Sequence, residues 1–63
     1  MTAFIYTTVG RIVADDNLTA LRKVQMLNRL DSSLWRAYGF YSHTYNEGRQ
    51  IIAEAKQSLQ ADA

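Results

Sequence analysis

The feature that most constrains the fold is an apolar repeat in the second half of the chain. Apolar residues or glycine recur at alternating spacings of four and three, at Leu34, Tyr38, Tyr41, Tyr45, Gly48, Ile52, Ala55 and Leu59. This seven-residue repeat is typical of a helix that packs along a partner helix. We therefore expect a long amphipathic helix over residues 33–60, with this seam buried.

The length of this helix leaves two alternatives. About 28 residues would form a helix of about 42 Å, whereas a compact chain of 63 residues has a diameter of roughly 27 Å. The helix could break near Thr44–Gly48, where Thr44 and Glu47 match a capping box. It could instead stay whole and pack its overhanging part on a second copy. The seam keeps its register across the suspected break, which favours the whole helix and a homodimer.

The first residues of the chain have the composition of a β-strand. Residues 2–14 are rich in β-branched and aromatic side chains, which are enriched in strands. Gly10 divides this segment, so it predicts either a hairpin of two short strands or one strand with a bulge.

A short helix is expected next, over residues 17–30. Asp15, Asp16 and Asn17 are suitable caps for its start, and apolar residues recur every third position after them. Asp31-Ser32-Ser33 predicts the turn into the long helix. The expected fold is therefore α+β and helix-dominated, in one domain over residues 1–63: an N-terminal β-strand or hairpin, a short helix and a long C-terminal amphipathic helix.

Composition limits the function classes. The chain has no cysteine, so it has no disulfide and no thiolate metal site. A core this small is marginal, and oligomerisation is a common remedy, which again favours a dimer. There is no run of about 18 apolar residues to span a membrane and no secretory signal, so we expect no membrane partner and a cytoplasmic location. The net charge of +1 is too small to imply nucleic acid by itself.

Candidate catalytic or metal-binding groups are few. His43 and Glu47 are four residues apart on one helical face, which suits either two metal ligands or a surface ion pair. They lie opposite the apolar seam and no third ligand is near in sequence, so we favour the ion pair. Asp15 and Asp16 are explained as turn and cap residues. We therefore expect no enzyme, no metal and no cofactor.

Tyrosines are unusual in a buried seam, because a buried hydroxyl needs a hydrogen-bond partner. They could pack on the chain's own strands with their hydroxyls in solvent, or form a partner surface, where aromatic residues are enriched. The candidate partner-binding residues are therefore the aromatic cluster and, second, two nearby arginines: Trp35, Tyr38, Phe40, Tyr41, Tyr45, Arg29 and Arg36.

The predicted function is a small non-enzymatic protein-binding regulator or inhibitor that acts as a homodimer, of the kind that phages and plasmids carry. The alternative is a small dimeric nucleic-acid-binding regulator that uses the basic face of the first helix. Arg22, Lys23, Arg29 and Arg36 lie in one short window, and two helices joined by a turn resemble a helix-turn-helix. Acidic residues on the exposed face of the long helix argue against this alternative.

Overall fold

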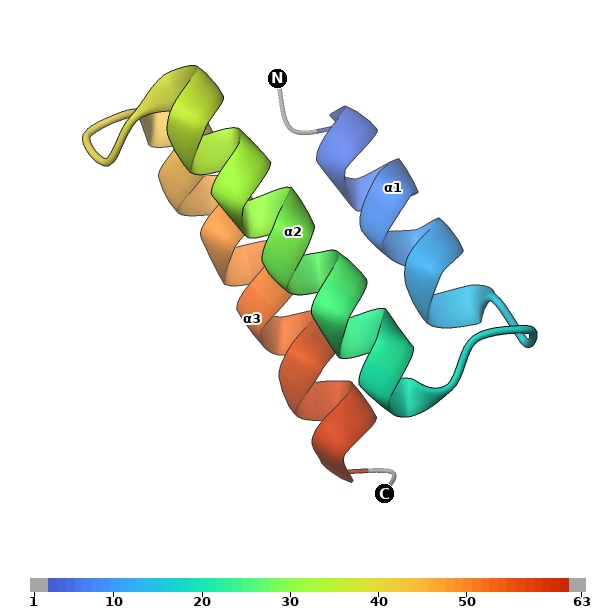
Figure 1. Ribbon diagram of the computed structural model, residues 1–63. Coiled ribbons are helices and arrows are strands. Elements are labelled where there is room, and N and C mark those ends of the chain that lie inside the picture. Colours follow the sequence, from blue (N-terminus) through green and yellow to red (C-terminus); the bar gives the residue numbers. More distant parts are fainter. Residues whose placement is uncertain (1–2, 62–63) are drawn as a thin grey trace.

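The computed structural model describes residues 3–61, which form three helices: α1 (Ala3–Ala14), α2 (Ala20–Tyr38) and α3 (His43–Ala61). Helices α2 and α3 run antiparallel, and α1 packs against both of them (Figure 1). Residues 3–61 contain no strand. The fold is therefore a small all-helical bundle, and the prediction of an α+β fold with an N-terminal strand or hairpin is wrong.

Helix α1 forms where the strand was expected because its apolar residues have a helical spacing. Ile5, Val9 and Ile12 are separated by four and three residues, and all three are buried. The hydroxyls of Thr7 and Thr8 donate hydrogen bonds to carbonyls four residues earlier, at 3.0 and 2.8 Å. Packing of one face onto α2 and α3 therefore overrides the strand preference of the β-branched residues.

Helix α2 begins later and ends later than the helix expected over residues 17–30. Thr19 is its N-cap, and the Thr19 hydroxyl accepts a hydrogen bond from the Arg22 backbone N–H at 3.1 Å. Asp15 accepts from the Asn17 N–H within the preceding loop. The helix continues through the turn predicted at Asp31-Ser32-Ser33, because Leu34 extends the buried stripe seven residues beyond Leu27.

The long helix expected over residues 33–60 is interrupted, and the break lies before Thr44–Gly48. Gly39 has φ 81° and ψ 164°, a combination that is accessible almost only to glycine. Its N–H donates to the Trp35 carbonyl at 2.7 Å, which closes the end of α2. The Asn46 side-chain amide donates to the Ser42 carbonyl at 3.0 Å in the first turn of α3. The chain thus reverses between residues 39 and 42.

The core lies where the three helices meet. Ile5, Leu27 and Ile52 are fully buried, one from each helix, and the remaining buried apolar residues surround them: Val9, Ile12, Leu34, Tyr45 and Leu59. Most of the predicted seam is therefore buried within one chain. The longest dimension of the molecule is 32 Å. The expected helix of about 42 Å does not form, so there is no overhanging part to pack on a second copy. The homodimer stays a prediction, but the seam is not available as its interface.

Candidate partner-binding surface

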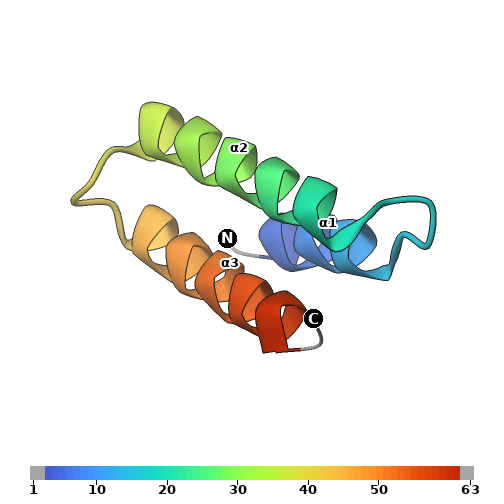
Figure 2. The same ribbon diagram turned by 60° about the horizontal axis from the view of Figure 1, so that its bottom comes forward.

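Helix α1 is shorter than the two helices that it covers, and one end of the α2–α3 hairpin extends beyond it (Figure 2). Ile5, in the first turn of α1, lies at the level of Leu34 and Gly48. Five of the aromatic residues are beyond this level, where α2 ends, the chain turns and α3 begins. We call this group the aromatic end: Trp35, Tyr38, Phe40, Tyr41 and Tyr45.

Tyr45 anchors the aromatic end to the core. Its side chain is buried, with 4% of its surface exposed, and its hydroxyl donates a hydrogen bond to Asp31 Oδ1 on α2 at 2.8 Å. This hydrogen bond, burial and the charge of Asp31 together raise the pKa of Tyr45, against a smaller effect of Arg49. Tyr45 is therefore a structural residue, and its hydroxyl has a hydrogen-bond partner.

Two edge-to-face contacts connect this anchor to the surface. The Phe40 ring lies 5.9 Å from the Tyr45 ring and 5.8 Å from the Trp35 ring, with interplanar angles of 88° and 77°. Such geometries are favourable beyond the apolar area that they bury. They hold Phe40 and Trp35 in place although both side chains are exposed.

The outermost aromatic residue is Tyr41, in the turn. Its relative exposure is 101%, and Tyr38 in the last turn of α2 is half exposed. A single exposed apolar residue needs no explanation, but a group of large exposed apolar residues is typical of an interaction surface. The structure therefore brings four of the five predicted aromatic contact residues to the surface and buries the fifth, Tyr45.

The two predicted arginines lie on the outer face of α2. With Asn28, Ser32 and Ser33, Arg29 and Arg36 line a shallow hollow of about 440 Å³. Arg36 is in the last turn of α2, next to Trp35 in sequence. Arg29 is two turns earlier, about 10 Å along the helix axis. Arg36 can therefore share a partner with the aromatic end, whereas Arg29 lies farther from that end on the same outer face of α2.

His43 and Glu47 are in contact at the surface, as expected, with Nε2 of His43 2.7 Å from Oε1 of Glu47. The histidine side chain is 88% exposed, so the pair contributes little to stability. Within residues 3–61, no three His, Asp or Glu side chains are grouped closely enough to hold a metal ion.

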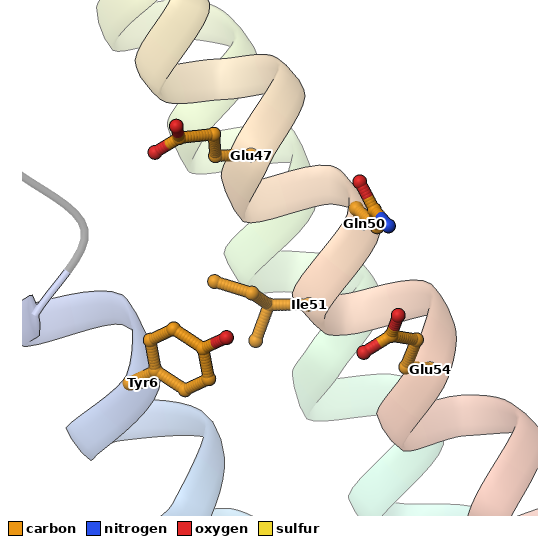
Figure 3. A pocket seen from close by; sticks show the side chains of 5 residues that line it. All are labelled: Tyr6, Glu47, Gln50, Ile51 and Glu54. Carbon is orange, nitrogen blue, oxygen red and sulfur yellow. The ribbon is translucent and has the colours of Figure 1, made fainter.

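A second hollow, which sequence reasoning missed, lies between α1 and α3 (Figure 3). It measures about 300 Å³ and is lined by Tyr6, Glu47, Gln50, Ile51 and Glu54. The three polar residues of α3 follow a helical spacing that is visible in the sequence. No spacing in the sequence joins Tyr6 to them, because the composition of residues 2–14 predicts a strand.

The function of this chain has to be inferred from its own sequence and geometry, because comparisons with known proteins give no relative. Neither the protein-family models, nor the curated proteins, nor the solved structures include a match to this chain. Over residues 3–61, no helix combines the length and the apolar character needed to cross a membrane.

The link between Tyr45 and Asp31 predicts a dependence of stability on pH. The pKa of Tyr45 is raised in the folded chain, so its contribution is complete below about 10, the ordinary tyrosine value, and is lost as the pH rises through the folded pKa. We expect Tyr45→Phe to lower the melting temperature at neutral pH, and the gap from the original chain to narrow above about pH 10. Thermal unfolding followed by circular dichroism measures both effects. A gap that stays constant up to pH 11 or so would contradict the assigned hydrogen bond.

Proposed function

We propose that this chain is a small non-enzymatic regulator or inhibitor that binds another protein through the aromatic end. One observation carries the proposal: four large aromatic side chains are exposed together at one end of the bundle. Two of them are held by ring contacts: Phe40 packs edge-to-face on the buried Tyr45, and Trp35 packs edge-to-face on Phe40. Side chains that are already ordered lose less conformational entropy on binding, and rigid aromatic anchors dominate the energies of protein interfaces.

Arg36 supports the same surface from the side. It lies in the last turn of α2, and arginine is enriched at interfaces because its planar guanidinium forms several directed hydrogen bonds. The expected partner surface therefore has an apolar depression for the aromatic rings, with a carboxylate at its edge.

The experiment is an affinity capture from a lysate that has been treated with nuclease. The original chain is compared with its Tyr41→Ala variant. Tyr41 makes no contribution to the core, so its removal is expected to change the melting temperature by less than about 4 °C. Loss of an interface anchor is expected to weaken partner binding by about tenfold or more. Captured protein is quantified by mass spectrometry, and the affinity is then measured with the purified partner.

Tyr6→Ala is the matched control for this experiment. Tyr6 is also an exposed tyrosine, at 63%, but it lies on α1, outside the aromatic end. Capture that survives Tyr6→Ala and is lost with Tyr41→Ala supports the proposal. Equal capture by all three chains would place the partner surface elsewhere.

Nucleic-acid binding is the second candidate, and one observation favours it. The arginines of α2 lie on the outer face of the bundle, whereas Glu47 and Glu54 line the hollow between α1 and α3. The acidic residues Glu47 and Glu54, which would repel nucleic acid, therefore lie away from the basic face of α2. Capture that disappears after nuclease treatment or at moderate salt would favour this candidate.

A further inference from the structure

The hollow between α1 and α3 has a chemistry of its own. It is lined by two carboxylates, an amide, a tyrosine ring and a half-buried isoleucine. No cationic side chain lines it, although the Glu47 carboxylate also contacts His43 outside the hollow. In Figure 3, Tyr6 of α1 and Ile51 of α3 face each other between the two helices, Glu47 lies on the same side of α3 as Ile51, and α2 is behind α3, so the hollow opens away from α2. We call this surface the acidic groove: Tyr6, Glu47, Gln50, Ile51 and Glu54.

The opposite side of the bundle is basic. Arg22, Arg29 and Arg36 recur every seven residues along α2. At 100° per residue, Arg29 and Arg36 lie about 180–200° around the helix from the buried Leu27, so they point out of the bundle. We call these three residues the arginine ridge. Among residues 3–61, no carboxylate lies within ion-pair distance of them.

Groove and ridge match in spacing as well as in charge. Glu47 and Glu54 are seven residues apart on α3, as Arg29 and Arg36 are on α2. Both separations are about 10.5 Å along a helix axis. One helix laid along the other would therefore bring both carboxylates to both guanidinium groups together. The face of the Tyr6 ring is available to a further cation.

From this complementarity we propose that the chain associates with itself, the arginine ridge of one copy lying in the acidic groove of the next. In Figure 2, α2 forms one side of the bundle, while α1 and α3 form the other. Ridge and groove are therefore on opposite faces, and each contact leaves one free ridge and one free groove. Such a head-to-tail contact does not close as a two-fold dimer, so further copies can add and the assembly grows with concentration. The proposal shares only Arg36 with the proposed function and uses no residue of the aromatic end. Its test uses the pure chain without a partner, so the two proposals can fail separately.

The first measurement is the weight-average mass of the pure, nuclease-treated chain by sedimentation over a concentration series. At about 10 mM salt, where the Debye length is ~30 Å, the mass is expected to rise above the 7.2 kDa of one chain. At about 1 M salt, where the Debye length is ~3 Å, it is expected to return to one chain. Two exposed ion pairs of ordinary strength change an association constant by a factor of about 2 to 30.

Paired charge reversals test which surfaces are in contact. One variant carries Glu47→Arg with Glu54→Arg, and the other carries Arg29→Glu with Arg36→Glu. Each variant alone presents groove and ridge of the same sign, so it is expected to stay monomeric where the original chain associates. An equal mixture presents opposite signs again and is expected to restore association. Helical content by circular dichroism confirms that each variant folds, and Glu47→Gln with Glu54→Gln replaces the first if it does not.

Control variants with the same changes in net charge separate this contact from general attraction. They are Asp15→Arg with Asp16→Arg, and Arg11→Glu with Arg49→Glu, which leave ridge and groove intact. Each control alone is expected to associate, unlike the paired reversals. The proposal is overturned if the original chain stays monomeric at low salt, if the reversals and the controls behave alike, or if the mixture fails to associate. It is also overturned if the mass increase appears only before nuclease treatment, since nucleic acid would then bridge the ridges.

Discussion

Gly48→Leu is expected to remove a large part of the stability of this chain. A Cβ atom on Gly48 would lie 3.0 Å from Cδ1 of Ile5 and 3.0 Å from Cδ1 of Leu34. Alanine could be accepted by small shifts of these two flexible ends, but leucine would force α1 away from the hairpin. Overpacking of this kind costs about 3 kcal/mol at the upper end of its usual range. A chain of 63 residues has a total stability of roughly 3–9 kcal/mol. Urea unfolding followed by circular dichroism measures the loss.

Gly10→Leu is the control with the same chemical change. A Cβ atom on Gly10 has no neighbour within 4 Å, and the residue lies in the interior of α1. Leucine favours the helix there over glycine by about 0.5–1 kcal/mol, so this variant is expected to be slightly more stable. If the two leucine variants unfolded at the same urea concentration, α1 would not be docked on α2 and α3 in the way described.

Leu27→Ala is expected to cost about 2–5 kcal/mol. Leu27 is 0% exposed and lies at the centre of the core. Its removal loses apolar burial and leaves a cavity that a small bundle can only partly close. The same substitution at Leu21, which lies on α2 and is 70% exposed, is expected to change stability by no more than about 0.5 kcal/mol. Equal losses in urea unfolding would mean that α2 is rotated about its axis relative to this structure.

The apolar seam shows how far the sequence leads. Its spacing of four and three correctly marked Tyr45, Gly48, Ile52 and Leu59 as one helical face, and all four are buried. The same spacing could not show that the helix ends at Tyr38. The four residues between α2 and α3 leave the seven-residue repeat of apolar positions approximately in register. This repeat alone therefore does not distinguish two helices joined by a turn from one straight helix. The sequence does contain one sign of the helix end, namely Gly39, because a straight helix has no need of a glycine at this position.

The N-terminal segment shows the opposite error. Composition favoured a strand, whereas Ile5, Val9 and Ile12 already had a helical spacing. Propensity describes a residue in an average environment, and here the environment is two helices with an apolar groove between them. Periodicity reports which face will be buried, so it is the more reliable signal for a segment of this length.

The candidate site was predicted in part. Trp35, Tyr38, Phe40 and Tyr41 are exposed, but the sequence placed Tyr41 on the same face as Tyr45, which is buried. The difference arises because Tyr41 lies in the turn, where helical spacing no longer determines direction. The acidic groove could not be predicted at all, because it combines Tyr6 of α1 with residues of α3.

The short first helix has a consequence for how this protein can change over generations. Because α1 stops at the level of Gly48 and Leu34, the side chains of Trp35, Tyr38 and Tyr41 do not belong to the buried core. Mutations among them alter the outer surface without opening a cavity, so they escape the selection that preserves foldability. Specificity for a partner can therefore drift or be re-engineered at this end, while the remainder of the bundle stays the same.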